Sequence, residues 1–217
     1  MKIINTEKED YHVHSFTYSD GLATINEIAQ YAGQIGMKKV VITDHSQATL
    51  DYLGLVKKVP KTIRTRWQNV YNDVEVTFGV EADLLNEDGD VCFDIAGDER
   101  DFVILSFHKN IFKGDMSKAT EGFIKAIQRF HERINMIGHV CQQPRLIDSK
   151  KVIEEANKHK IPLELNARYF LKEPEDWKDF FENAEQIYVN SDSHTLVEFR
   201  DLRKKAYELL KEMGYLK

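Results

Sequence analysis

The chain has 217 residues, of which 42% are hydrophobic and 11% aromatic, so it can bury one full-sized core without requiring a second. We therefore expect a single domain over residues 1–217. Thirty lysines and arginines stand against 36 aspartates and glutamates, so the formal net charge is −6 and no overall positive field attracts nucleic acid or an anionic membrane.

The cysteines and the first residues indicate a compartment. Cys92 and Cys141 are far apart and form no Cys-x-x-Cys pair, which argues against a disulfide framework or a zinc knuckle and favours a reducing cytoplasm. The opening segment MKIINTEKED lacks the apolar core of a signal peptide, and no stretch approaches the ~18 uncharged apolar residues of a membrane span. We expect a cytoplasmic protein without a membrane anchor.

The chain begins with a strand, a helix and a second strand. A short apolar run predicts a strand at 11–14. Thr24 and Glu27 then form a capping box that opens an amphipathic helix, and Gly36 ends it. The next apolar run predicts a strand at 39–43, so strand and helix alternate from the start.

Two stretches interrupt this alternation in the middle of the chain. The first, 46–73, separates the second strand from a predicted strand at 74–80. The second, 84–101, precedes a predicted strand at 102–107 and contains Glu-Asp-Gly-Asp at 87–90, which indicates a hairpin turn. We expect both stretches to be excursions from the main fold.

The second half of the chain returns to the alternation. In chain order it predicts a helix around Phe123 to Phe130, a strand at 134–138, a helix after Asp148, a strand at 161–166, a helix at roughly 174–181, a strand at 187–190 and a final helix. The final helix opens on a capping box formed by Thr195 and Glu198.

Most of the seven predicted strands are apolar on both faces, which is typical of a parallel sheet covered by helices. Repeated strand and helix units imply either an α/β barrel or a doubly wound sheet. Seven strands favour an incomplete barrel, in which the carboxyl ends of the strands meet at one mouth where active sites are built.

Six of the eight histidines lie at or just after the end of a predicted strand, and acidic residues accompany them. These residues are His12, His14, Asp44, His45, Glu81, His108, His139, Asp192 and His194. We expect them to line the single mouth of the barrel. Any one of them alone would fit an ordinary hydrogen-bonded side chain, but six histidines at strand ends make that interpretation improbable.

The pair His12 and His14 shows how such residues can bind a cation. Alternation along a strand directs both imidazoles to one side while Val13 packs behind them. With the other histidines and carboxylates they form a mixed nitrogen and oxygen ligand set, which suits zinc, manganese or iron. We leave out His131 and His159, whose places in predicted helices fit ordinary surface or core roles.

Six motifs now resemble a known family, the polymerase and histidinol phosphatase (PHP) metallohydrolases. In order they are DYHVHSFTYSDG, VVITDHS, GVEADLL, LSFHKN, MIGHV and VNSDSH, and they extend from Asp10 to His194. The resemblance implies a distorted seven-stranded (β/α)7 barrel, similar to a TIM barrel, with three divalent metal ions at the C-terminal ends of the strands. It also implies a metal-dependent phosphoester hydrolase.

The resemblance further implies a set of ligands for each ion. One ion is held by His12, His14, Glu81 and Asp192, and Glu81 bridges to a second held by His108 and His139. A third is held by Asp20, His45 and His194. Some relatives have histidine in place of Asp20, so the identity of the third metal stays open among zinc, manganese and iron.

Closely spaced cations lower the pKa of a bridging water and stabilise charge in an in-line displacement at phosphorus. Asp192 or a water on the third metal then protonates the leaving alkoxide, and the sequence leaves both open. Lys109, Arg145 and Arg168 follow predicted strand ends and are candidates to bind the substrate phosphate, although each fits an ordinary surface charge equally well. Arg64 and Arg66 are weaker candidates.

Two further residues are expected to support the site. Cys141, two residues after His139, is predicted to be a small buried thiol beside the metals. Asp44 is next to His45 in the chain and is predicted to orient a ligand imidazole.

The leading functional hypothesis is a phosphomonoesterase that acts on a small phosphorylated metabolite through a metal-activated hydroxide. A phosphodiesterase or exonuclease acting on nucleotides or short nucleic acid would use the same metals, but it needs a basic or aromatic groove and the sequence has no long basic run. A histidinol-phosphatase is a further alternative, although the chain is short for that branch. The last is a non-catalytic metal-stabilised module, which the nine filled ligand positions argue against.

Overall fold

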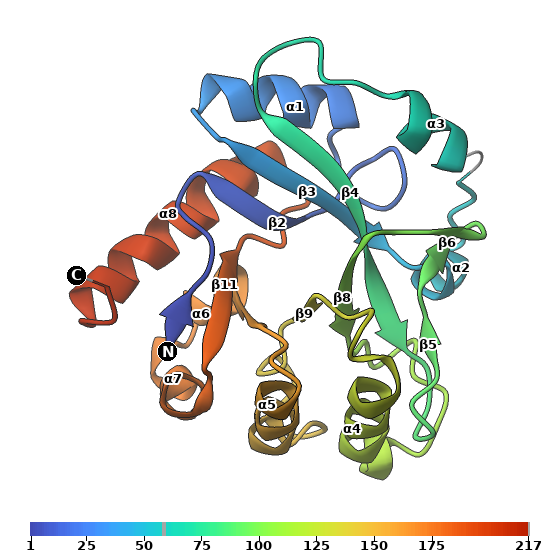
Figure 1. The fold of residues 1–217 in the computed structure, drawn as a ribbon, viewed down its shortest axis with the longest axis vertical. Coiled ribbons are helices and arrows are strands. Elements are labelled where there is room, and N and C mark those ends of the chain that lie inside the picture. The colour runs from blue at the N-terminus through green and yellow to red at the C-terminus, as the bar shows by residue number, and fades with distance from the viewer. Residues whose placement is uncertain (58–59, 217) are drawn as a thin grey trace.

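A curled parallel sheet forms the centre of the computed structural model, which describes residues 1–57 and 60–216 (Figure 1). In spatial order its strands are β1 (Lys2–Ile3), β11 (Gln186–Asn190), β10 (Leu163–Asn166), β9 (Met136–Ile137), β8 (Phe102–Ser106), β4 (Glu75–Leu84), β3 (Lys39–His45) and β2 (Glu9–Val13). Each strand pairs in parallel with its neighbour. All the strands predicted from the sequence are therefore present, and β1 adds to the edge.

Aromatic contacts across the sheet show how strongly it curls. The ring centroid of Tyr11 on β2 lies 5.5 Å from that of Phe102 on β8 and 4.7 Å from that of Tyr188 on β11. These strands are not neighbours along the sheet, so their rings meet because the sheet folds round on itself. The sheet is a half-barrel whose hollow is filled by side chains.

The two edges of the half-barrel touch at one end. The backbone N–H of His14, just after β2, donates to the carbonyl oxygen of Ser193 at 2.9 Å. Val13 and Ser193 also form an isolated parallel bridge. Because both segments lie at the carboxyl ends of β2 and β11, the chain is drawn together where the candidate ligands occur.

Amphipathic helices cover the outside of the sheet: α1 (Ile25–Gln34), α4 (Ala119–Phe130), α5 (Ser149–Lys158) and α8 (Leu196–Glu212). The capping boxes predicted at Thr24 and Thr195 are both formed, and Asp148 caps α5. Gly36 follows α1 with φ of 73°, a left-handed conformation that favours glycine. Local sequence signals therefore set the ends of these helices.

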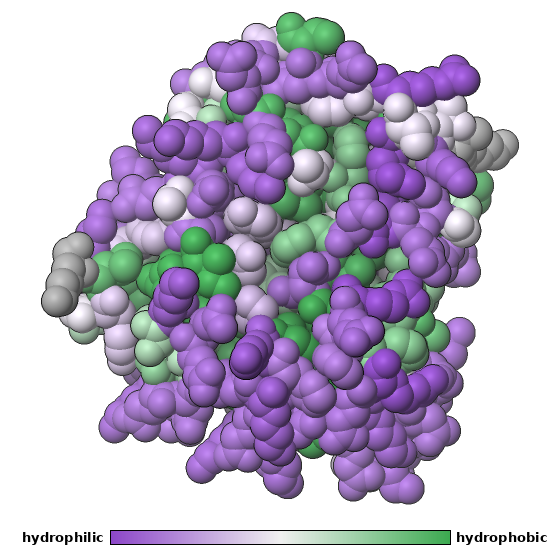
Figure 2. Space-filling model, in the orientation of Figure 1, coloured by the Kyte–Doolittle hydropathy of each residue, from purple (hydrophilic) through white to green (hydrophobic). Residues whose placement is uncertain are grey.

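The largest part of the core lies between α4, α5 and the sheet. Phe123 and Ile127 of α4 and Val152 of α5 are almost completely buried there, together with Leu105 of β8 and Leu163 of β10. Truncating a buried phenylalanine such as Phe123 to alanine typically costs about 3–5 kcal/mol of stability. Hydrophilic side chains cover the outward faces of the same helices at the lower edge of Figure 2.

The described parts of both excursions contain helices or strands of their own. The stretch 46–73 contains α2 (Gln47–Leu53) and α3 (Pro60–Arg66). In the second stretch, β5 (Val91–Cys92) pairs antiparallel with β4 and Gly89 in the turn has φ of 77°, which confirms the predicted hairpin. A small ladder of β6 (Asp94–Ile95) and β7 (Asp98–Glu99) follows, and Arg64 of α3 donates twice to Asp98 at 2.9 and 3.0 Å.

Short helices complete the fold. A 3₁₀-helix at Met116–Lys118 leads into α4, and α6 (Ala167–Phe170) follows β10 directly. The helix predicted at roughly 174–181 is divided into a 3₁₀-helix at Pro174–Trp177 and α7 (Lys178–Asn183). Among the described residues, no helix combines the length and the apolar character needed to cross a membrane.

Candidate metal centre

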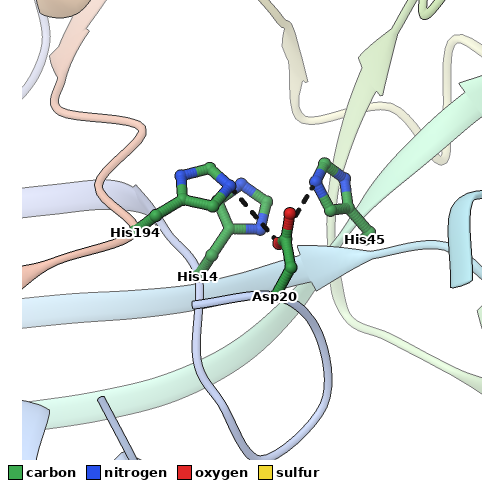
Figure 3. Close-up of side chains that lie close together, drawn as sticks. All are labelled: His14, Asp20, His45 and His194. Atoms are coloured by element: carbon green, nitrogen blue, oxygen red, sulfur yellow. Dashed lines mark ion pairs between the residues drawn. The ribbon is translucent and has the colours of Figure 1, made fainter. Parts of the chain in front are cut away.

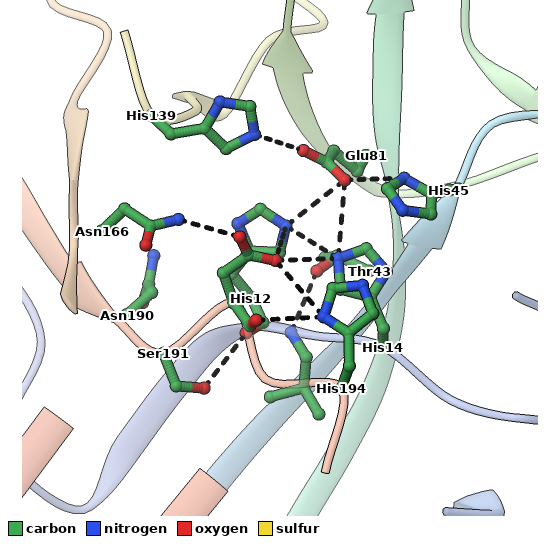
Figure 4. A network of polar contacts seen from close by, with 12 residues as sticks. His12, His14, Thr43, His45, Glu81, His139, Asn166, Asn190, Ser191 and His194 are labelled. Carbon is green, nitrogen blue, oxygen red and sulfur yellow. Dashed lines mark hydrogen bonds and ion pairs between the residues drawn. The ribbon is translucent and has the colours of Figure 1, made fainter. Parts of the chain in front are cut away.

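The residues predicted as metal ligands come together at the carboxyl end of the half-barrel. His45 is the last residue of β3, and His108, His139 and Asp192 each follow a strand by two positions. Glu81 lies within β4 rather than after it, because β4 continues to Leu84 in order to pair with β5. Its side chain still points into the same mouth (Figure 4).

Glu81 is at the middle of this cluster. One carboxylate oxygen, Oε1, lies 2.7 Å from Nε2 of His139 and 3.4 Å from Nε2 of His108. The other oxygen, Oε2, lies 2.8 Å from Nδ1 of His45 and 3.5–3.6 Å from Nε2 of His14 and His12. A single buried carboxylate therefore faces five imidazoles, the arrangement expected of a group that bridges ions.

The ends of β2 and β11 supply a second part of the cluster. Nε2 of His12 and Nε2 of His14 are 3.1 Å apart, so the two rings converge as alternation predicted. Oδ1 of Asp192 lies 3.2 Å from Nε2 of His14 and 3.5 Å from Nε2 of His12. Asn166 donates to the other oxygen of Asp192 at 3.1 Å and holds that carboxylate in place.

A third group lies toward solvent, where His14, Asp20, His45 and His194 approach one another (Figure 3). Oδ1 of Asp20 lies 3.3 Å from Nε2 of His194 and 3.6 Å from Nε2 of His45. The side chain of Asp20 is 36% exposed and that of His194 is 23% exposed, whereas His12 and His14 are fully enclosed. The cluster is therefore more open to solvent at Asp20 and His194 than at His12 and His14.

The loop that carries Asp20 is held closely against β2. The backbone N–H and the hydroxyl of Ser15 donate to the two oxygens of Asp44 at 2.6 and 2.7 Å. A Cβ atom at Gly21 would lie only 2.3 Å from the carbonyl oxygen of His14, so this position requires glycine. Asp44 therefore positions the loop, and the described hydrogen bonds include none that joins it directly to an imidazole.

Carboxylates that were not predicted from the sequence contact the outer nitrogens of two imidazoles. Oδ1 of Asp83 lies 2.6 Å from Nδ1 of His108, and Oε1 of Glu164 lies 2.7 Å from Nδ1 of His12. A partner on the outer nitrogen fixes the tautomer and leaves the inner nitrogen free to bind a metal. The available signal was a charged residue inside an apolar strand, as in Leu-Glu-Leu-Asn at 163–166.

Two candidate ligands have an unusual backbone conformation. His139 has φ of 23° and Asp192 has φ of 51°, both in the positive range that residues with a Cβ rarely adopt. Such conformations cost roughly 1–3 kcal/mol each and persist only where surrounding contacts impose them. The folded chain thus stabilises these two residues in the conformations that direct them at the cluster.

Charges within the cluster change the protonation of its members. Burial by itself raises the pKa of Glu81, but His108, His12 and His45 outweigh burial and hold that pKa well below its ordinary value. Burial lowers the pKa of His12, yet Glu164, Asp192 and Glu81 raise it well above its usual range. The carboxylates therefore create a negative field that attracts protons or cations.

His14 behaves differently from its neighbour on the strand. Burial, together with the nearby His194 and His45, lowers the pKa of His14 to about 3. Its imidazole is therefore neutral over the physiological pH range. Ser19 lies 3.3 Å from Nδ1, so Nε2 can present a lone pair to the inside of the cluster, as a metal ligand must.

Unsatisfied polar atoms test whether this donor set fits metal ions. Oε2 of Glu81 and Nδ1 of His45 are buried and lie 2.8 Å apart, yet neither forms a well-aligned hydrogen bond within the described structure. Nε2 of His12 and Nε2 of His14 lie 3.1 Å apart, so the two ring nitrogens converge on the same space. Divalent cations would satisfy these nitrogen and oxygen atoms together, so the residues present fit such ions.

The candidate phosphate-binding cations differ in their surroundings. Arg168 lies at the centre: Nη2 donates to the carbonyl oxygen of Asp192 at 2.9 Å and contacts Oε1 of Glu198 at 3.1 Å. Lys109 follows His108 but is exposed, and Arg145 is exposed without a described ion pair. Arg64 is paired with Asp98, and Arg66, on the same helix, is exposed.

Cys141 follows His139 at the edge of the cluster. It is half-buried, and burial raises the pKa of its thiol to about 12. No described contact joins it to a candidate ligand. Its role as a passive side chain beside the metals stays a prediction.

Comparisons with known proteins show which family and which fold this chain resembles. The family described as PHP domain matches residues 10–189 of the chain. A protein of Escherichia coli (strain K12) named "Probable phosphatase YcdX" is 28% identical over 196 residues, covering 86% of this chain and 78% of its own length. The protein of the same name from Shigella flexneri is equally similar.

A solved structure shares the fold. It is the histidinol phosphate phosphatase of Lactococcus lactis, complexed with zinc, L-histidinol and phosphate. It aligns with a TM-score of 0.61 and 18% sequence identity, over 96% of this chain and 94% of that one. The α/β fold with a curled parallel sheet is therefore shared, although the sequences have diverged.

Proposed function

This chain belongs to the PHP domain family, and we propose that it is a metal-dependent phosphomonoesterase that hydrolyses a small phosphorylated metabolite. The observation that carries this proposal is the position of Glu81, whose two oxygens face five imidazoles within 3.6 Å at the mouth of the sheet. The similarity of the chain to the probable phosphatase of Escherichia coli supports the same reaction class.

Three divalent cations, zinc, manganese or iron, would be held by the predicted ligand groups. The side chains concerned are His12, His14, Asp20, His45, Glu81, His108, His139, Asp192 and His194. His14 belongs both to the group of His14, Asp20, His45 and His194 and to the group of His12, His14 and Glu81, so it could contribute its Nε2 lone pair to an ion in either group. When bound, such ions polarise phosphoryl oxygens and supply an acidified water at neutral pH.

The protein's own side chains would orient the phosphate and move its protons. Arg168 lies beside Asp192 and His194 and presents a planar guanidinium, so we assign it to bind a phosphoryl oxygen. Lys109 and Arg145 are exposed and would contact only the outer part of a substrate. Phosphate recognition in this proposal therefore depends mainly on Arg168.

Asp192 is the candidate catalytic residue. Burial raises the pKa of its carboxyl, but His12 and His14 outweigh burial and lower it below the ordinary value. An ionised carboxylate accepts a proton more readily than it donates one. We assign Asp192 to proton transfer at the reacting oxygens, and the leaving alkoxide would be protonated either by Asp192 or by a water on the third ion.

A cavity beside the cluster supports a small substrate. Its volume is about 320 Å³, and Gln142, Tyr169 and Trp177 form part of its wall. The ring of Tyr169 lies 6.2 Å from that of His139, so one wall residue of this cavity is close to a candidate ligand. That space fits the organic part of a small phosphate ester.

We also infer the finer architecture that the resemblance implied. Counted from β2 to β11, the strands would form one distorted seven-stranded barrel, with β1 as an addition at the edge. The contact between His14 and Ser193 supports closure at the ligand end. All 217 residues would then belong to one domain.

Phosphate release from a panel of phosphorylated metabolites tests this function. The protein is loaded with Zn²⁺ or Mn²⁺, its metal content is measured, and hydrolysis of monoesters is compared with that of bis(p-nitrophenyl) phosphate. We expect turnover of at least one monoester and a large loss of rate in Asp192→Asn. Bound metal without hydrolysis of any monoester contradicts the proposal, and a preference for the diester favours a phosphodiesterase.

A further inference from the structure

Glu164 is a completely enclosed carboxylate that contacts several candidate ligands without being one of them. It lies on β10 with no exposed surface, inside the curl of the sheet. Four donors surround it: Nδ1 of His12 at 2.7 Å, the backbone N–H of His139 at 3.0 Å, Nδ2 of Asn190 at 3.2 Å and Nδ2 of Asn166 at 3.4 Å.

Its two oxygens act on different parts of the cluster. Oε1 accepts from the ring of His12, which keeps the proton on Nδ1 and leaves Nε2 to face Glu81 and Asp192. Oε2 accepts from the backbone N–H of His139, whose φ of 23° needs such support. One carboxylate therefore holds ligands that come from β2 and from the segment after β9.

Glu164 is also linked to a third candidate ligand, Asp192, through the side-chain amide of Asn166. Nδ2 of Asn166 lies 3.4 Å from Oε2 of Glu164 and 3.1 Å from Oδ2 of Asp192. The side-chain oxygen of the same Asn166 caps α6 by accepting from the N–H of Arg168 at 3.1 Å. Movement of Glu164 would therefore disturb the setting of Asp192 as well as that of the two histidines.

Only an ionised carboxylate suits this position. All four neighbours donate, and a carboxylate is the side chain that offers acceptors alone on both oxygens. A glutamine would place its own N–H₂ group against at least one of those donors, so one hydrogen bond would be lost and a donor left buried without a partner. The requirement is thus one of charge and acceptor number rather than of size.

We propose that Glu164 is a positioning residue that sets two metal ligands at once, His12 through its tautomer and His139 through its backbone. The inference rests on the proposed metal centre and extends it to a residue outside the ligand set. A carboxylate with only a structural role would stabilise the chain without changing metal affinity. If Glu164 positions the ligands, its replacement weakens binding of the ions that these histidines hold.

Metal binding by the full chain tests the proposal without reference to catalysis. Zn²⁺ affinity is measured by competition with a chelator, and the absorption spectrum of the Co²⁺-loaded protein reports the ligand geometry. We expect Glu164→Gln to weaken binding by about 10- to 100-fold, the usual effect of removing such a partner, and to change the Co²⁺ spectrum. Unchanged affinity and an unchanged spectrum would overturn the proposal.

Glu155→Gln is the matched control, because Glu155 is also a largely buried carboxylate but pairs with Gln128 and Lys158 between α4 and α5. We expect it to keep wild-type metal affinity; an equal loss there would attribute the effect to general destabilisation and overturn the proposal. Should Glu164→Gln not fold, Glu164→Asp keeps the charge but is too short to reach both histidines. Wild-type affinity in Glu164→Asp would then contradict the assignment.

The result separates this inference from the proposed function. If the wild-type chain binds metal and hydrolyses no monoester, the proposed function fails while the role of Glu164 is still tested by metal affinity. If monoesters are hydrolysed and Glu164→Gln binds metal as the wild type does, only the role of Glu164 fails.

Discussion

Oε1 of Glu81 lies 2.7 Å from Nε2 of His139, although the two residues are 58 positions apart in the chain. Glu81 is on β4 and His139 follows β9, and β8 separates these strands in the sheet. Their side chains meet because the sheet curls and both point into the hollow. Together with its contacts to four other imidazoles, this contact makes Glu81 the residue that joins the cluster.

Replacing Glu81 with glutamine should abolish binding of at least one metal ion. The amide loses the negative charge and one of the two acceptor oxygens that face the imidazoles. We expect phosphatase activity to fall by more than the roughly 10- to 100-fold that loss of a partner outside the ligand set typically costs. Elemental analysis and phosphate release are measured together, and full metal content with full activity would contradict the role of Glu81.

Removing metal should lower the thermal stability of the protein. Ions that bind the folded chain at about 100 times their Kd contribute about 2.7 kcal/mol for each site, which corresponds to a shift of roughly 5–10 °C in Tm for a chain of this size. Thermal unfolding is followed with and without EDTA, and Zn²⁺ or Mn²⁺ is then restored. A Tm that does not respond to chelation or reloading would contradict a metal centre.

Arg168→Ala should impair the reaction while leaving the metals in place. A hydrogen bond to a charged group contributes about 1.5–3 kcal/mol, so kcat/KM should fall by roughly 10- to 150-fold. Arg145→Ala provides the comparison, because Arg145 is exposed and has no described ion pair. We expect it to keep nearly full activity. Steady-state kinetics on both variants decide the matter, and equal effects would remove the distinction between them.

Alkylation should report the environment of Cys141. Burial raises the pKa of its thiol to about 12, so the reactive thiolate is scarce at pH 8. In the folded protein its reaction with iodoacetamide should be slow and should accelerate about tenfold for each pH unit between 8 and 11. Mass spectrometry measures the rate, with unfolded protein as the control. A rate that levels off near pH 9 would show an ordinary thiol.

The buried ion pair between Asp10 and Arg203 should be important for folding. Oδ2 of Asp10 lies 2.9 Å from Nε of Arg203, and both residues are almost fully enclosed. Arg203→Ala leaves that carboxylate without its partner and should cost about 3–5 kcal/mol in the free energy of unfolding. Arg200→Ala, which removes an exposed pair with Asp201 on the same helix, should cost less than about 1 kcal/mol. Urea denaturation compares the two variants.

Local signals in the sequence were sufficient for the order of the main strands and helices. Capping boxes at Thr24 and Thr195 operate within one helical turn, so they are readable without knowledge of the fold. The same holds for the left-handed glycines after α1 and in the hairpin. The division of 174–181 into a 3₁₀-helix and α7 was not predicted from the sequence; Trp177 and Phe180, at this division, are both buried in the core.

The sequence by itself also determined which residues are candidate ligands, since their types and their places at strand ends depend only on the chain. Tertiary structure alone decided which atoms meet: Glu81 among five imidazoles, Asp44 with Ser15, and Asp83 and Glu164 behind His108 and His12. Those contacts depend on the curl of the sheet and on the direction of each side chain. Both arise from packing between segments far apart in the sequence, which no local pattern encodes.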